Sequence, residues 1–166
     1  MVEMPGKVKR QGKDMGKRID IAGIVAKVGT GYPPPHDAPC KARERKPLGG
    51  AAGLTQFGVN LLRLAPGVWS AQRHWHTRED EFVFVVSGEV VLVTDSGEEI
   101  LRAGDCAGFK AGDPNGHCLQ NRSQADAVVL EIGSRFPEED ACDYPDIDMI
   151  APAGAPHYAH RDGTPY

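Results

Sequence analysis

The residues best suited to chemistry lie between His74 and Glu81, with one more histidine, His117, further along the chain. His74 and His76 are one residue apart, and because side chains on an extended segment repeat with period two, both imidazoles project to one face. The carboxylate of Glu81, past a short turn, and the imidazole of His117, from a distant strand, would complete a set of three nitrogens and one oxygen. Such a donor set suits a single divalent metal ion.

The identity of the carboxylate ligand affects the whole strand that follows it. Glu81, which four residues separate from His76, is the favoured ligand. Asp80, which three residues separate from His76, is the alternative. With Glu81 as ligand, Val83 and Val85 line the interior, and the outer side chains are Phe82, Phe84 and Val86. An outer face this apolar needs a cover, either from a second sheet, from a wrapping segment or from a second subunit. We expect a homodimer on this basis.

The elements that must hold these residues are predicted to be short strands. Twenty glycines and thirteen prolines in 166 residues indicate many turns. Expected strands cover residues 19–28, 55–64, 72–77, 80–86, 90–94, 98–101, 105–109, 117–121 and 127–132. No long stretch with a period of 3.6 residues competes with them. The predicted fold is therefore all-β, an antiparallel sandwich or small barrel.

The chain length fits one domain with flanking segments. Residues 1–52 are interpreted as a basic N-terminal arm, covering 1–18, and a proline- and glycine-rich wrapping segment. Residues 53–136 form the barrel, and residues 137–166 form an irregular tail. The tail prolines disfavour a strand in the centre of a sheet; they are Pro145, Pro152, Pro156 and Pro165.

Composition excludes several classes of function. Nineteen Lys and Arg against 23 Asp and Glu give a formal charge of −4, so no nucleic-acid or acidic-membrane partner is indicated. No signal peptide and no apolar run long enough to cross a bilayer are recognisable, so a cytoplasmic protein is expected.

The four cysteines form no Cys-x-x-Cys pair, and Cys118 is interpreted as a packing residue. His157 and His160 are expected at the surface.

These two histidine-containing blocks resemble the motifs of the cupin superfamily. The first motif of that family has a glycine, five residues, His-x-His, three or four residues, a glutamate, six residues and a glycine. Glu81 and Gly88 match this spacing, whereas six residues instead of five separate Gly67 from His74. The second motif ends with a histidine, three residues and an asparagine, as His117 and Asn121 do. Its proline is replaced by Lys110, and four residues instead of two separate Gly112 from His117.

The resemblance implies a double-stranded β-helix, or jelly roll, with the metal inside the barrel mouth. Residues 111–117, Ala-Gly-Asp-Pro-Asn-Gly-His, and the ending Asp-Gly-Thr-Pro-Tyr look like a group of small single-domain cupins labelled sugar-phosphate isomerases. The ligand set accommodates Zn, Mn, Fe, Ni or Co, and zinc is expected in isolated protein.

An isomerase reaction needs further residues near the metal. Glu79 is the candidate base if it turns into the barrel mouth. Gln72 and Asn121 are predicted to orient substrate hydroxyls, and the candidates for contact with a phosphate are Arg63, Arg73, Lys110 and Arg122. Two other functions remain open at this point. With Fe(II), the same ligands would support a dioxygenase-type reaction, and without turnover the domain would bind a small polar ligand.

Overall fold

A computed structural model describes residue 16 and residues 18–166. Its largest element is a six-stranded sheet in the order β1-β2-β3-β10-β5-β8. The strand bounds are β1 Lys27–Val28, β2 Glu44–Pro47, β3 Phe57–Leu64, β10 Ala127–Ser134, β5 Glu81–Ser87 and β8 Cys106–Phe109. All pairings in this sheet are antiparallel. Two helical elements, the 3-10 helix η1 (Ala38–Cys40) and α1 (Leu48–Ala52), flank β2.

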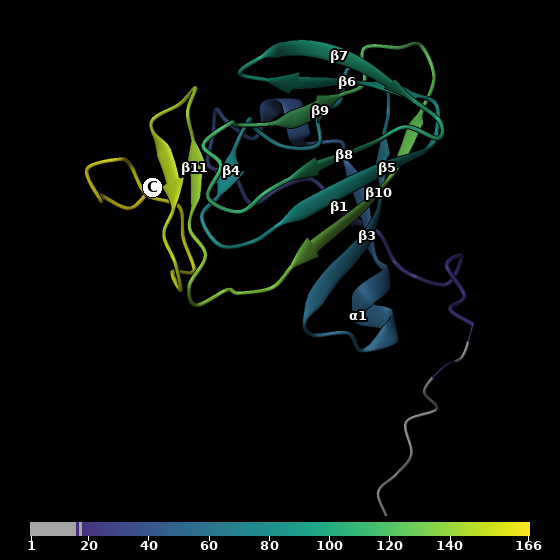
Figure 1. The fold of residues 1–166 in the computed structure, drawn as a ribbon, viewed down its shortest axis with the longest axis horizontal. Coiled ribbons are helices and arrows are strands. Elements are labelled where there is room, and N and C mark those ends of the chain that lie inside the picture. The colour runs from purple at the N-terminus through teal and green to yellow at the C-terminus, as the bar shows by residue number, and fades with distance from the viewer. Residues whose placement is uncertain (1–15, 17) are drawn as a thin grey trace, which may run out of the picture.

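Two smaller sheets complete the barrel (Figure 1). One has the order β7-β6-β9, with bounds Gly97–Arg102, Glu89–Thr94 and Cys118–Gln120. The other has the order β12-β11-β4, with bounds Met149–Ala151, Cys142–Tyr144 and Trp75–His76. The predicted all-β jelly-roll fold is confirmed. Within the described residues, no helix combines the length and apolarity that a membrane crossing requires.

The main core lies between the six-stranded sheet and the β7-β6-β9 sheet. Alternate residues of β5 face opposite ways: Val83 and Val85 are buried, whereas Phe82, Phe84 and Val86 are exposed. This is the parity expected when Glu81 faces the interior. Core side chains from the neighbouring strands include Leu62, Leu64, Val90, Leu92, Leu119 and Val129. The barrel therefore has an aliphatic floor beneath the residues that could hold a metal.

The flanking segments are more regular than predicted. Residues 29–52 add β2 to the main sheet, and only Lys27–Val28 of the expected strand 19–28 is a strand. The tail supplies β11, which lies in the centre of its sheet, so the prediction of an irregular tail is wrong in part. The tail prolines fall outside β11 and β12, where they remove no ladder hydrogen bond. Of the expected basic arm, residues 1–15 and 17 lie outside the described part of the chain.

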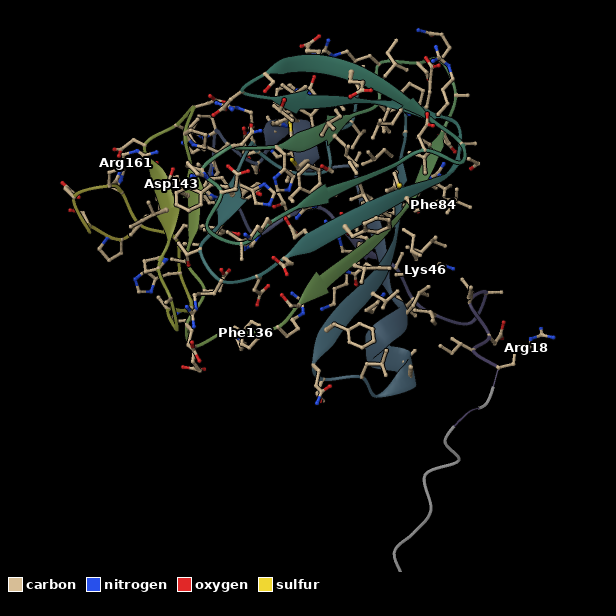
Figure 2. All side chains as sticks on the ribbon, viewed as in Figure 1. Arg18, Lys46, Phe84, Phe136, Asp143 and Arg161 are labelled. Carbon is tan, nitrogen blue, oxygen red and sulfur yellow. The ribbon has the colours of Figure 1, made fainter. Side chains whose placement is uncertain are left out.

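The tail is held by ion pairs as well as by strand pairing. Arg161 donates two hydrogen bonds of 2.9 Å to the carboxylate of Asp143, and these side chains lie together in the tail (Figure 2). A second buried cluster joins this tail to the N-terminal segment; it contains Tyr32, Cys40, Ala71, Cys142, Tyr144 and Met149. Both flanks of the barrel therefore meet beside β4, the strand that carries His76.

Candidate metal centre

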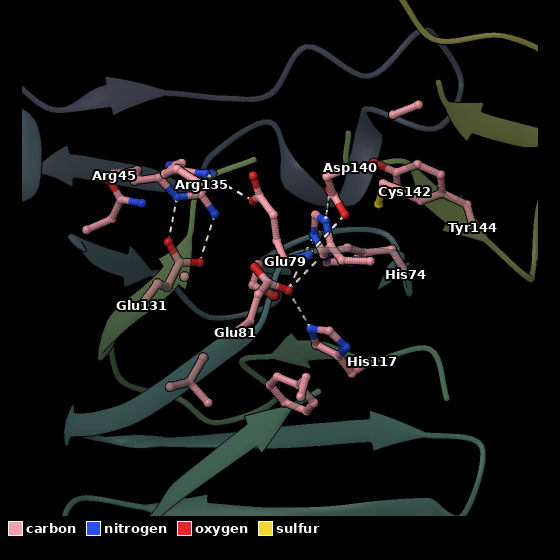
Figure 3. A pocket seen from close by; sticks show the side chains of 18 of the residues that line it. Arg45, His74, Glu79, Glu81, His117, Glu131, Arg135, Asp140, Cys142 and Tyr144 are labelled. Carbon is pink, nitrogen blue, oxygen red and sulfur yellow. Dashed lines mark hydrogen bonds and ion pairs between the residues drawn. The ribbon is translucent and has the colours of Figure 1, made fainter. Parts of the chain in front are cut away.

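Three imidazoles and one carboxylate converge at the barrel mouth. Oε2 of Glu81 lies 3.0 Å from Nε2 of His117, 3.6 Å from Nε2 of His74 and 3.5 Å from Nε2 of His76. Metal–ligand bonds of about 2.1 Å place neighbouring donor atoms about 3.0 Å apart in an octahedron and about 3.4 Å apart in a tetrahedron. The three separations from Glu81 match these edges. His74, Glu81 and His117 form one group of close donors that could hold a divalent cation (Figure 3). His76 adjoins this group through its 3.5 Å contact with the same Glu81 oxygen.

Backbone pairing brings the two histidine blocks together. His74 and His117 face each other in an antiparallel bridge, in which each backbone N–H donates to the other's carbonyl, at 3.1 and 2.8 Å. Phe109 at the end of β8 stacks on the His117 ring, with centroids 3.5 Å apart and planes 2° apart. Glu81 begins β5, between Gly133 of β10 and Phe109 of β8. Each ligand is therefore carried by a strand or a strand end.

Hydrogen bonds orient two of the three rings. Nδ1 of His74 lies 2.8 Å from the carbonyl oxygen of Gln72, and Nδ1 of His76 lies 2.6 Å from Oδ2 of Asp140. With Nδ1 donating, Nε2 of both rings carries the lone pair that a metal needs. Nδ1 of His117 is buried and has no hydrogen-bond partner among the described residues. The stacked Phe109 ring holds His117 instead.

The charge of Glu81 dominates the electrostatics of this cluster. Burial acts to raise the pKa of Glu81, but hydrogen bonds from His117 and His74 hold it well below its usual value. Burial acts to lower the pKa of His74, but Glu81 raises it overall. Burial and the neighbouring His74 lower the pKa of His117 despite the hydrogen bond to Glu81. An ionised carboxylate among neutral imidazoles is the form that binds a cation.

Other acidic groups and a thiol lie near the four ligands. Asp80 is exposed and accepts a hydrogen bond of 2.8 Å from the Ala111 N–H, so Glu81 and not Asp80 lies with the histidines. Cys142 is close enough to His74 and His76 to form a donor group with them. Burial raises the pKa of the Cys142 thiol, so it is protonated at neutral pH and is a poorer ligand than Glu81.

Glu79 does turn into the barrel mouth. It is buried and lines a cavity of about 450 Å³, hereafter the main cavity, which the four candidate ligands also line. Its Oε1 accepts a hydrogen bond of 2.7 Å from the Phe136 N–H, and its Oε2 lies 3.6 Å from Nη1 of Arg135. A carboxylate from Glu79 and one from Asp140 form a further group of close donors with His76.

The three predicted substrate-binding residues do not line this cavity. Asn121 is fully buried, and its amide donates to the carbonyls of Leu64 and Ala125, both at 2.8 Å. Gln72 donates to the His36 carbonyl, and Arg63 is at the surface between Glu44 and Asp126. Their predicted contacts with substrate are therefore corrected: Asn121 braces a turn, and Arg63 forms a surface ion-pair network.

The candidate phosphate ligands are also placed elsewhere. Arg73 is paired with Asp95 and Asp146, Arg122 with Glu98, and neither lines the main cavity. Lys110 lines a second cavity of about 180 Å³, on which His76, Glu81 and His117 also border. The basic residues of the main cavity are instead Arg43, Arg45 and Arg135. Sequence reasoning missed them because nothing in their spacing connects them to the histidine motifs.

Comparison with known proteins identifies the family. The Cupin domain family matches residues 60–133. A sugar phosphate isomerase from a cupin superfamily, from Silicibacter pomeroyi DSS-3, shares 43% identity with the chain, with a TM-score of 0.85 over 90% of this chain and 96% of the other. The chain belongs to the cupin superfamily.

A second solved structure is less similar in sequence but still covers most of the chain. A protein of Acidithiobacillus ferrooxidans, provisionally named a sugar phosphate isomerase, shares 30% identity and a TM-score of 0.63, over 75% of this chain and 74% of the other. A predicted oxalate decarboxylase of Thermotoga maritima, at 18% identity and a TM-score of 0.60 over 72% of this chain and all of the other, supports the fold alone. None of the curated proteins compared with this cupin matches it.

Proposed function

We propose that this cupin isomerises a small phosphorylated sugar at a single divalent-metal centre formed by His74, His76, Glu81 and His117. The observation that carries the proposal is the convergence of the three Nε2 atoms on one Glu81 oxygen, at 3.0–3.6 Å, inside the main cavity. The class of substrate is taken from the 43% identical Silicibacter protein, which is named a sugar phosphate isomerase. We propose zinc as the ion in isolated protein.

The metal and the protein have separate tasks in this reaction. A divalent cation at this centre supplies Lewis-acid polarisation of a carbonyl and an adjacent hydroxyl oxygen. The exchange of an aldose for a ketose moves one proton from carbon two to carbon one and one from the oxygen on carbon two to the oxygen on carbon one. No oxidant or reductant is consumed. The protein must therefore provide a group that takes and returns a proton beside the metal.

Glu79 is suited to that task. Its carboxylate is buried, lines the cavity and lies in one donor group with His76 and Asp140. The Phe136 N–H fixes Oε1 at 2.7 Å, while Oε2 has only the longer 3.6 Å contact with Arg135. We propose that Oε2 accepts the proton from the substrate carbon and returns it to the neighbouring carbon.

Proton exchange with solvent tests this function. Zinc- or manganese-loaded protein is incubated with a panel of aldose and ketose phosphates in deuterated water, and deuterium at carbons one and two is followed by NMR. We expect exchange with at least one sugar phosphate. Glu79→Gln should slow it at least about 100-fold with unchanged metal affinity, because a general base contributes about 10²–10⁴-fold. Glu99→Gln, an exposed carboxylate on β7, is the matched control and should retain full exchange.

Two results would overturn the proposal. One is the absence of exchange in metal-loaded protein across the whole panel. The other is exchange that Glu79→Gln leaves intact, which would remove Glu79 from the reaction. Consumption of oxygen by the Fe(II)-loaded protein in the absence of any exchange would identify the site as an oxygenase instead.

A further inference from the structure

Arg43 is a buried arginine in the main cavity with no acidic partner. The residue is 8% exposed, and no carboxylate lies within salt-bridge distance of it in the described part of the chain. Its Nε donates to the Gly29 carbonyl at 2.9 Å, and its Nη1 donates to the Ser70 carbonyl. Its Nη2 makes no hydrogen bond to any described residue and is not fully buried. Nη2 therefore keeps some exposed surface, and Arg43 itself lines the main cavity.

The other charged groups of the cavity are already matched. The contacts are Arg45 with Glu131 at 2.7 Å, Arg135 with Glu79 at 3.6 Å, Asp140 with His76 at 2.6 Å, and Glu81 with the three histidines. Within the described part of the chain, Arg43 has only neutral partners, so no acidic side chain there compensates its positive charge. A buried charge of this kind is costly unless something pairs with it. The ligand of the cavity is the remaining source of a negative charge.

A row of aromatic rings connects Arg43 to the metal centre. The Arg43 guanidinium carbon lies 5.7 Å from the centre of the Tyr32 ring, and Tyr32 packs edge-on against Tyr144 at 5.5 Å. Tyr144 stacks in turn beside His74, with ring centroids 5.8 Å apart. All four residues line the same cavity. Arg43 and the metal ligands therefore border one continuous space.

We propose that Arg43 forms an oxyanion subsite, which binds the phosphoryl or carboxylate group of the ligand while the other end of the ligand reaches the metal centre. The free Nη2 and the remaining Nη1 hydrogen provide donors on the planar guanidinium for a tetrahedral or planar oxyanion. A cavity of about 450 Å³ is within the usual size range for small-ligand sites. This inference rests on the proposed function in that the same cavity holds the substrate.

Arg43, Tyr32 and Tyr144 all lie outside residues 60–133, the part that matches the family. β2 begins one residue after Arg43, and Tyr144 ends β11 of the tail. The family core thus supplies the metal ligands, and the flanking segments supply the oxyanion subsite. This arrangement separates the chemistry of the metal from the selection of the ligand.

Anion binding to the metal-free protein tests the subsite. Metal is removed with a chelator and the chelator by dialysis, so that neither can bind the anion. Inorganic phosphate, glycerol 3-phosphate and glycerate are titrated by calorimetry at constant ionic strength. We expect saturable binding of at least one, weakened at least about ten-fold in Arg43→Gln, because hydrogen bonds to a charged group contribute about 1.5–3 kcal/mol. Arg43→Lys, which keeps the charge, should bind better than Arg43→Gln.

Arg122→Gln is the matched control, because Arg122 is exposed, pairs with Glu98 and lies outside the cavity. Thermal melts show whether each variant is folded. If Arg43→Gln does not fold, arginine Nε–Hε NMR signals of wild-type protein replace it, with the Arg43 signal expected to shift on addition of phosphate. Binding that Arg43→Gln leaves unchanged, an unshifted Arg43 signal, or no anion binding would overturn the inference. Because no metal is present, the result is independent of whether isomerase activity is found.

Discussion

At the residue scale, Asp140 orients one of the candidate metal ligands, His76. Its Oδ2 lies 2.6 Å from Nδ1 of His76, and its Oδ1 accepts hydrogen bonds from the Arg78 and Glu79 N–H groups, at 2.8 and 3.1 Å. These N–H groups orient the carboxylate, which in turn orients the ring. Asp140 is thus a positioning residue for His76, contributed by a segment 64 residues away along the chain.

We therefore expect Asp140→Asn to weaken zinc binding about 10- to 100-fold, the usual effect of removing such a partner. An amide can donate to Nδ1 and so favour the wrong tautomer of His76. Competition with a fluorescent zinc chelator measures the affinity, and Glu139→Gln, which changes an exposed neighbour, should leave it unchanged. Equal affinities for the two variants would show that Asp140 has no influence on the ligand.

Removal of metal should lower the stability of the protein. A ligand that binds only the folded state at 100 times its dissociation constant stabilises that state by about 2.7 kcal/mol. Chelation should therefore lower the melting temperature of the zinc-loaded wild type by several degrees. Glu81→Gln, which removes the shared carboxylate, should show no further decrease on chelation, whereas Glu99→Gln should behave as wild type. A chelator-insensitive wild type would contradict the proposed site.

At the element scale, the turn between β5 and β6 depends on Gly88. Its φ is +76°, and a Cβ there would lie 2.6 Å from the Asp126 carbonyl oxygen and 2.9 Å from Cα of Ala127. Gly67, in the turn after β3, has a similar φ of +82°, but a Cβ at this position would have no other atom within 4 Å. Substitution of Gly67 therefore introduces backbone strain alone, whereas substitution of Gly88 introduces the same strain and a steric clash.

We expect Gly67→Ala to cost about 1–2 kcal/mol of unfolding free energy, from its left-handed backbone alone. Gly88→Ala should cost about 1–3 kcal/mol more, because the added methyl also displaces β10. Urea denaturation followed by tryptophan fluorescence measures both. Similar losses in the two variants would mean that β10 yields to the methyl without cost.

At the scale of the whole molecule, the outer face of β5 is exposed and apolar. Phe82, Phe84 and Val86 are 41%, 38% and 48% exposed, and neither a second sheet nor the wrapping segment buries them in the described chain. Among the described residues, neither a second sheet nor the wrapping segment provides the cover considered from the sequence, so a second subunit is the cover we expect. The homodimer stays a prediction of this surface.

Phe84→Glu should convert the dimer to monomer, or weaken it at least about ten-fold, since it introduces a charge at the centre of an apolar patch. Phe136→Glu is the control: Phe136 is 48% exposed but follows β10, and the two side chains are well separated (Figure 2). Sedimentation velocity over a wide concentration range measures the change. A wild type that remains monomeric throughout would refute the prediction.

The sequence by itself determined the barrel and predicted the four residues that converge on the candidate metal centre. Local rules are sufficient for these: the His-x-His spacing sets which side chains share a face, glycine-rich turns set the strand ends, and the Glu81 parity correctly separates Val83 and Val85 from Phe82 and Phe84. Only the tertiary structure decided what surrounds the donors. The buried side-chain amide of Asn121 donates its hydrogen bonds to the carbonyls of Leu64 and Ala125, and it therefore does not reach the cavity.

The fold alone also explains why Asp140, Cys142 and Arg43 line the cavity of the candidate metal centre. Their positions follow from long-range pairings, such as Cys142 of β11 opposite His76 of β4, that join segments far apart in the chain. No spacing rule predicts such pairings, because they depend on how the proline-rich flanks pack against the closed barrel. The local period of the strands therefore specified the candidate metal ligands, and packing between distant segments specified the residues that orient them and line the cavity.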